Sequence, residues 1–361
     1  MSTGSIPGRS NTRSPCTARP LAIALAAISL LPLTPHQTAA QSFYEGKQLT
    51  LVVGSGVGGG YDVYARLVAR HWARHIPGRP TIVVQNLPAA GSLVATNNTA
   101  NTYPRDGLTV TQVQSHMSVE PLMGVTGSLD NVKFDARTLN WIGSIAKEYP
   151  LVVAWHAAPI KSFQDVLTRE MVVGASGTAT SDAVYPRLMN EMIGTRFKVI
   201  DGYKDNPQMI LATESGEIMG RSGWFISSLL STQGQQLQEG KLRVLAQIAT
   251  EKHPLFPDVP LVTEFITDPE KRKALEFSIS WLPMGRPFVA PPGVPAERLK
   301  VLRDSFMAAA GDPELLAEAR KMNLEVSPLS GEETQALVGR LYETPKPVIQ
   351  AVRRIMAPGV R

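Results

Sequence analysis

A short apolar strand that stops at glycines and leads into an amphipathic helix is the feature that most limits the fold of this chain. Residues 49–53 are bulky and apolar, as in a buried parallel strand, and they end at Gly54. Over residues 62–75, apolar side chains recur at four-residue steps, and arginines recur at the same step on the other side. Because strands that alternate with helices build helix-covered parallel sheets, this order predicts an α/β fold.

The same order of strand, loop and helix is repeated along the chain. We expect further strands over residues 81–84, 108–113, 151–154, 171–173, 197–200, 242–249, 277–281 and 288–290. Helices are expected from Ser92 to about residue 100 and over residues 182–193. Four more helices should begin near Pro207, Pro295, Pro313 and Gly331. Two units result, each a mixed, mainly parallel sheet flanked by helices.

The length of 361 residues allows two or three domains. The segment after residue 283 has no obvious sheet of its own, so we expect it to return to the first unit. The chain would then cross between units twice, near residues 141–150 and 275–283. This predicts a discontinuous domain I (41–145 plus 276–361) and a domain II (146–275).

The first forty residues have the order of a signal peptide. Arg9, Arg13 and Arg19 precede an apolar run over residues 21–33, which is too short to span a bilayer. Small residues at 38–40 follow, so we predict cleavage before Gln41 and export to the periplasm. An uncleaved anchor or a buried helix is the alternative.

The basic character of the chain comes largely from this leader. Its three arginines supply three of the five net positive charges, and it contains no acidic residue. Lysines and arginines interleaved with aromatic residues, as nucleic-acid binding requires, are missing elsewhere, so we expect no nucleic-acid partner. The single cysteine, Cys16, precedes the apolar run and would leave with the leader, which suits an oxidising compartment.

Residues 54–59 match the dinucleotide motif G-x-G-x-x-G, but the acidic residue expected at the end of the second strand is replaced by Gln85 and Asn86. We therefore expect no nucleotide cofactor. The loops over residues 56–62, 88–92 and 174–181 share another design, in which small residues open a helix whose free N–H groups favour a small anion. Tight turns without a ligand are the alternative for each loop.

Other candidate sites are weaker. His71 and His75 are four residues apart but lack the glutamate of H-E-x-x-H, so we interpret them as solvated surface and expect no metal. Ser176 is followed directly by Gly177, and no G-x-S-x-G nucleophile motif exists. Glu214 and Glu217 are interpreted as helix-end charges.

Arg221 leaves two interpretations open. It follows an expected short strand over residues 217–220 and precedes the start of another helix. In a cleft it could hold a carboxylate with two parallel hydrogen bonds, with Trp224 as an apolar wall. Alternatively, it is a surface arginine beside a core tryptophan.

Several segments together resemble the extracytoplasmic solute-binding proteins of tripartite tricarboxylate transporters, also called the Bug family. They cover nearly all of the predicted mature chain and read GGGYD (58–62), VVQNLPAAGS (83–92), PRDGLT (104–109), GASG (174–177), GYK (202–204), PLFPDVP (254–260) and FVAPPGVP (288–295). The resemblance implies a two-domain periplasmic-binding-protein clamshell, type II-like, that closes on a small carboxylate.

The resemblance also implies which residues contact the ligand. From domain I these are Val57, Gly58, Gly59, Pro88, Ala90, Gly91, Ser92, Ser115 and His116, and from domain II they are Ser176, Gly177, Thr178 and Tyr203. Arg221 and Trp224 join this set from the argument given above. Asp62 matches the family's aspartate after the glycines and is expected to order the loop. The chain departs from the family at residues 54–57, at Ala89 and at residues 220–223, which puts the identity of the ligand in doubt.

We therefore predict a monomeric periplasmic receptor, not an enzyme, for a small organic acid. The acid would be a mono- or dicarboxylate, aromatic acids included, and would be delivered to the membrane subunits of a tripartite transporter. The alternatives are a ligand-loaded partner of a sensor kinase and a secreted hydrolase that uses Ser176 or a carboxylate.

Overall fold

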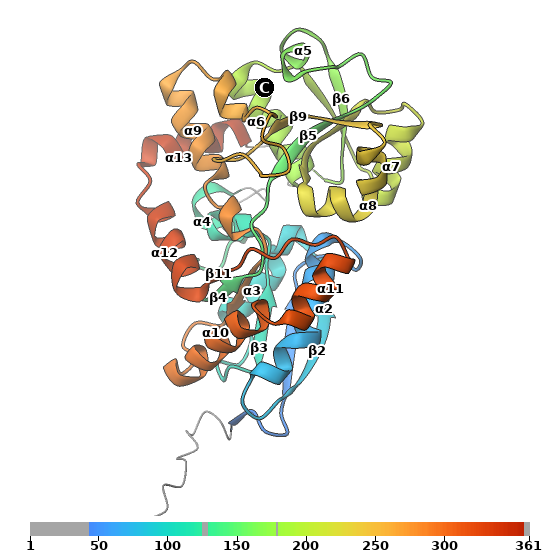
Figure 1. The fold of residues 1–361 in the computed structure, drawn as a ribbon. Coiled ribbons are helices and arrows are strands. Elements are labelled where there is room, and N and C mark those ends of the chain that lie inside the picture. Colours follow the sequence, from blue (N-terminus) through green and yellow to red (C-terminus); the bar gives the residue numbers. More distant parts are fainter. Residues whose placement is uncertain (1–42, 125–128, 178–179, 357–361) are drawn as a thin grey trace, which may run out of the picture. The chain divides into compact units, whose positions relative to one another are not determined.

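The computed structural model describes residues 43–124, 129–177 and 180–356, and the strands within these ranges form two sheets (Figure 1). The predicted leader, its cleavage site, Cys16 and Thr178 lie outside the described residues. None of the helices in the described ranges is both long and apolar enough to span a bilayer.

The first sheet combines three parallel strands with antiparallel additions. Its order is β11-β4-β10-β3-β1-β2, in which β1, β2 and β3 are parallel and β10 runs antiparallel between β3 and β4. The strand bounds are β1 Gln48–Val53, β2 Thr81–Asn86, β3 Thr109–Gln112, β4 Asn140–Ser144, β10 Pro287–Ala290 and β11 Leu329–Ser330. Helices associated with this sheet are α2 Gly60–Trp72, α3 Leu93–Asn101, α10 Ala296–Ala310, α11 Pro313–Lys321 and α12 Gly331–Tyr342.

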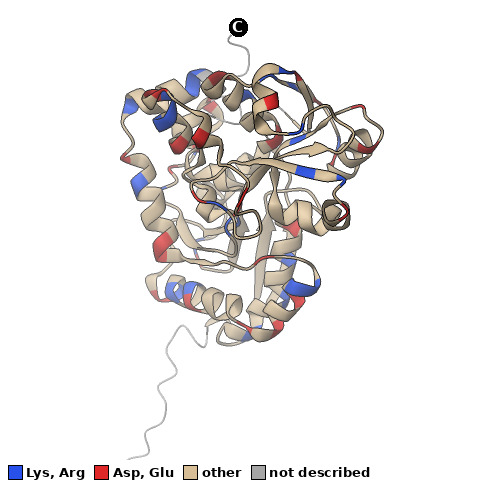
Figure 2. Cartoon of the chain, turned by 45° about the horizontal axis from the view of Figure 1, so that its top comes forward, with Lys and Arg blue, Asp and Glu red and all other residues tan. Residues whose placement is uncertain are grey.

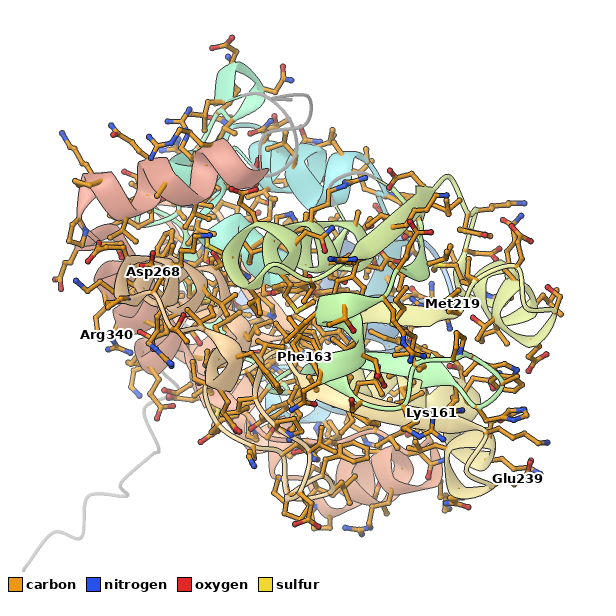
Figure 3. The ribbon with its side chains drawn as sticks, turned by 90° about the horizontal axis from the view of Figure 1, so that it is seen from above. Lys161, Phe163, Met219, Glu239, Asp268 and Arg340 are labelled. Carbon is orange, nitrogen blue, oxygen red and sulfur yellow. The ribbon has the colours of Figure 1, made fainter. Side chains whose placement is uncertain are left out.

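The second sheet has the order β7-β6-β8-β5-β9, with β5 antiparallel to both of its neighbours. Its strands are β5 Pro150–Trp155, β6 Met171–Ala175, β7 Phe197–Asp201, β8 Gly220–Phe225 and β9 Leu242–Gln247. Helices α5 Phe163–Thr168, α6 Ser181–Ile193, α7 Asn206–Glu214 and α8 Ile226–Gln238 alternate with these strands. In Figure 3, Phe163 lies among the packed side chains of this half, whereas Glu239, just after α8, lies at the edge.

The two sheets take their strands from different parts of the chain. Strand β4 was not among the expected strands. Strands up to residue 144 and from residue 287 onward form the first sheet, and strands over residues 150–247 form the second. The exact domain boundaries stay a prediction. One buried apolar cluster contains Trp141 and Val289 of the first sheet together with Val152 and Val173 of the second. The apolar core is therefore continuous from one sheet to the other.

The expected strand over residues 277–281 is wrong, because these residues belong to a helix and the turn after it. Helix α9, Pro269–Ile279, begins where the Asp268 carboxylate accepts the N–H groups of Glu270 and Lys271. The aromatic and apolar residues at its end suggested a strand, but the capping aspartate and Pro269 start a helix before them. Sequence analysis also missed α13, Lys346–Met356, which packs against α9.

The interpretation of His71 and His75 as solvated surface is also wrong. His71 Nε2 lies 2.6 Å from a Glu318 oxygen, and His75 Nε2 lies 2.6 Å from an Asp312 oxygen. Arg70 and Arg74, from the same end of α2, pair with the same two carboxylates. These histidines therefore attach α11 to the end of α2.

Candidate ligand-binding site

The three parallel strands of the first sheet end level with one another. Val53, the last residue of β1, is in register with Asn86 of β2 and Gln112 of β3. Because parallel strands present their carboxyl ends at one edge, the loops that follow all leave from that edge, where open α/β sheets bind ligands.

Ser92 connects these three loops through hydrogen bonds. Its hydroxyl donates to the Gly54 carbonyl at 2.7 Å and accepts from the Gln114 N–H at 3.1 Å. Ala90, Gly91 and Ser92 all have positive φ, so this turn is held in a strained left-handed conformation. A Cβ at Gly54 would lie 2.5 Å from the Ser92 hydroxyl oxygen, which explains the glycine. Ser92 therefore shapes the edge, and its hydroxyl is already engaged.

Asp62 orders the glycine loop before α2. Its buried carboxylate accepts the Gly58 N–H at 2.8 Å, the Asn86 amide at 2.9 Å and the Arg66 guanidinium at 3.0 Å. Burial opposes ionisation, but these hydrogen bonds and the Arg66 charge outweigh it and lower the pKa of Asp62. The carboxylate stays charged, and Gly58 is held at φ +77°.

Asp182 orders the glycine-containing loop before α6 in the second sheet. Its carboxylate lies 3.3 Å from both the N–H and the hydroxyl of Ser176, and it also accepts from the Thr180 hydroxyl. Arg221 Nη2 lies 3.5 Å from it. Each glycine-containing loop is thus bound to an aspartate in the first turn of the next helix, and each aspartate is paired with an arginine.

Arg221 lies inside β8, which begins at Gly220, and the predicted strand over residues 217–220 is displaced from it. The side chain is buried, so the interpretation as a surface arginine is wrong. Nη1 donates to Asn206, the guanidinium lies 4.3 Å from the Trp224 ring centre, and Nε has no hydrogen-bond partner in the described part of the chain. Burial lowers the pKa of Arg221 to about 10, so it stays charged at neutral pH. A direct contact with a ligand carboxylate stays a prediction.

Tyr203 and Trp224 pack into the second half. The Tyr203 hydroxyl donates to Glu217 at 2.6 Å, and burial together with that carboxylate raises its pKa to about 12. Glu217 is therefore a partner of Tyr203 rather than only a helix-end charge. Trp224 Nε1 donates to the Ser228 hydroxyl at 3.3 Å.

Ser115 and His116 follow β3 at the same edge as the glycine loop. The Ser115 N–H donates to the Tyr61 hydroxyl at 3.2 Å, which connects this turn to α2. Burial lowers the pKa of His116, so the ring is neutral at pH 7. Its Nε2 is buried without a hydrogen-bond partner among the described residues.

A family model described as "Tripartite tricarboxylate transporter family receptor", TctC, matches residues 64–353. The chain belongs to the TctC family. A Cupriavidus necator protein named "UPF0065 protein in gbd 5'region" is 25% identical over 339 residues, which cover 91% of this chain and 94% of that protein.

Solved structures agree with this TctC assignment. The structure of the periplasmic binding protein BugD superposes with a TM-score of 0.66 at 18% identity and covers 86% of this chain and 98% of its own. An R. palustris protein solved with adipate gives a TM-score of 0.65 at 20% identity, with 85% and 97% covered. The family is therefore that of the tripartite tricarboxylate transporter receptors, and the chain shares its fold with the periplasmic binding protein BugD.

The structure gathers the predicted residues of this TctC chain into two groups. Val57, Gly58, Gly59, Pro88 and Ala90 are exposed on the loops of the first sheet, beside the more buried Gly91, Ser92, Ser115 and His116. Ser176, Gly177, Tyr203, Arg221 and Trp224 follow or lie in strands of the second sheet. Within the described ranges, Ser92, Tyr203 and Trp224 have their polar side-chain atoms engaged by protein groups.

Sequence analysis missed Gln112 at the end of β3. Its side chain is fully buried, and neither amide atom has a hydrogen-bond partner in the part of the chain that the structure describes. Buried amides are normally paired, so this one is available to water or to a ligand. The signal in the sequence was a glutamine inside the expected strand over residues 108–113.

Proposed function

We propose that this protein is a periplasmic receptor that captures a small organic acid between its two sheets and delivers it, unchanged, to the membrane subunits of a tripartite transporter. The family and fold support a receptor role, and they are not those of an enzyme. The proposal depends chiefly on the paired loop design, in which Asp62 and Asp182 each hold a loop at the start of a helix.

The paired aspartates favour an anionic ligand for an electrostatic reason. Asp62 is balanced by Arg66 and Asp182 by Arg221, so neither carboxylate leaves an unbalanced negative charge to repel an acid. The first N–H groups of α2 and α6 have no carbonyl partner within their own helices, and the helix dipole favours negative charge there. A carboxylate satisfies both conditions.

We propose a mono- or dicarboxylate as the ligand, since the R. palustris protein of the same fold was solved with adipate. Contacts would come from the loops over residues 57–59, 88–91, 115–116 and 176–178. A hinge motion would close the two halves around the ligand. The ligand would shift the population toward the closed state only by the difference between its affinities for the closed and open states.

The test is made on protein expressed with its leader and isolated from the periplasm. Its measured mass should correspond to a chain that begins at Gln41. Calorimetric titration should then show binding of adipate or of another acid from a panel of mono- and dicarboxylates, and no binding of adipamide, the uncharged analogue. Equal binding of adipamide, or no response to any acid, would contradict the proposal.

A further inference from the structure

Two segments that join the sheets meet at Glu148 and Arg286. Glu148 lies between β4 and β5, and Arg286 directly precedes β10. The Glu148 N–H donates to the Leu282 carbonyl at 3.2 Å. A Cβ at Gly285 would lie 2.8 Å from the Glu148 backbone nitrogen, so only glycine lets the two segments pack this closely.

The side chains at this crossing form a buried ion pair. Arg286 Nη2 lies 2.6 Å from Glu148 Oε1 and donates to the Ser227 hydroxyl at 2.9 Å, while that hydroxyl donates to Glu148 Oε1 at 2.5 Å. Arg286 is 1% exposed, Glu148 2% and Ser227 4%. Removal of one partner would leave a buried, uncompensated charge. The geometry of the pair is therefore firmly held.

The Arg286 guanidinium also contacts both halves of the molecule. It lies 4.1 Å from the ring centre of Tyr61, in the first turn of α2, and 5.2 Å from that of Phe225, at the end of β8. A Cβ at Gly60 would lie 2.9 Å from Nη2, so the guanidinium rests against the backbone where the first glycine loop becomes α2. Tyr61 in turn accepts the Ser115 N–H. One side chain thus links the crossing segments, the first-sheet loops and the start of α8.

We propose that Arg286 is a positioning residue for ligand binding: held by Glu148 and Ser227, it fixes the first glycine loop, through Gly60 and Tyr61, relative to the second sheet. This inference rests on the proposed receptor function. Arg286 would affect the affinity for the acid without contacting the acid. Because Arg286 would act through Gly60 and Tyr61, the proposal concerns the position of the loop rather than selectivity among acids.

The test compares Glu148→Gln, which removes the charge but keeps the shape, with Ser227→Ala, a milder change that leaves the ion pair in place. Asp312→Asn is the matched control, because it removes another buried carboxylate, which contacts Arg74 and His75 just beyond the far end of α2. We expect Glu148→Gln to weaken adipate binding roughly tenfold or more, within the usual range of coupling between sites. Ser227→Ala should weaken it less, and Asp312→Asn should leave it unchanged.

Hydrogen exchange without ligand provides a second measurement. Amides of residues 58–63 should exchange faster in Glu148→Gln and Ser227→Ala than in the wild type, whereas those of α10 should not change. Wild-type affinity and wild-type exchange in folded variants would overturn the positioning role while leaving the receptor function intact. Failure of the wild type to bind any acid would instead overturn the receptor function and, with it, this inference. If Glu148→Gln does not fold, Ser227→Ala decides between these outcomes.

Discussion

Asp62 and Asp182 occupy corresponding places at the starts of α2 and α6. Each accepts an N–H from the preceding loop and pairs with an arginine that comes from a different structural position. Arg66 lies one turn further along α2, whereas Arg221 comes from β8. A buried carboxylate requires a positive charge close to it. Asp62 obtains this charge from a residue of its own helix, and Asp182 obtains it from a strand that folding brings near.

The role of Arg221 can be separated from a direct ligand contact by a double-mutant cycle. We expect Arg221→Gln and Asp182→Asn each to weaken adipate binding, since either change frees the loop that begins at Ser176. The double variant should lose no more affinity than the worse single variant, because both changes remove one shared interaction. Calorimetry measures all three, with Asp312→Asn as control. An additional loss in the double variant would show that Arg221 contacts the acid directly.

Helix α2 shows how an element can serve two purposes along its length. Its first turn follows the glycine loop. Its last turn and the residues just after it, Arg70, His71, Arg74 and His75, contact Glu318 of α11 and the N-cap Asp312. Figure 2 shows basic and acidic residues interspersed along the helices in that view. His71 and His75 were interpreted as solvated surface, but four-residue spacing alone cannot distinguish a face in water from a face that meets an acidic neighbouring helix.

The attachment of α11 should depend on pH through Asp312. Its hydrogen bonds with His75, the Glu314 N–H and Arg74 outweigh burial and lower its pKa from 3.8 to about 2. A lowered folded-state pKa means that the stabilisation is complete above about pH 4 and is lost as the pH falls from about 4 to about 2. We expect the free energy of unfolding in urea to decrease by about 2 kcal/mol through this group over that interval.

Asp312→Asn provides the comparison, since an amide does not titrate. Its decrease in stability between pH 4 and pH 2 should be smaller than that of the wild type. An identical decrease in both proteins would mean that other carboxylates account for the acid sensitivity.

At the scale of the whole molecule, the continuous apolar core is the main finding. It includes residues from both sheets, so neither sheet can lose its packing without exposing apolar surface of the other. The two crossings near Glu148 and Arg286 add the buried ion pair to this shared core. Hinge motion must therefore take place without opening the core itself.

A shared core predicts one cooperative unfolding transition. Urea curves followed by tryptophan fluorescence and by far-UV circular dichroism should coincide, because both sheets unfold together. A saturating ligand should shift the single midpoint upward, since it binds only the folded state. Two separated transitions would contradict the shared core.

The α/β fold class, strands such as β1, β2, β5 and β6, and the glycine loops could be predicted from the sequence alone. These features follow from side-chain periodicity and from glycine and proline, which act over a few neighbouring residues. Sequence analysis misplaced β8 around Arg221 and took the end of α9 for a strand, because apolar and aromatic residues fit either structure when the cap is overlooked. The partners of Arg221, His71, His75 and Arg286 could not be read from the sequence and are known from the folded structure. Each of these side chains pairs with residues far away in the chain, and the free energy of a polar or charged group depends on the groups that folding brings around it.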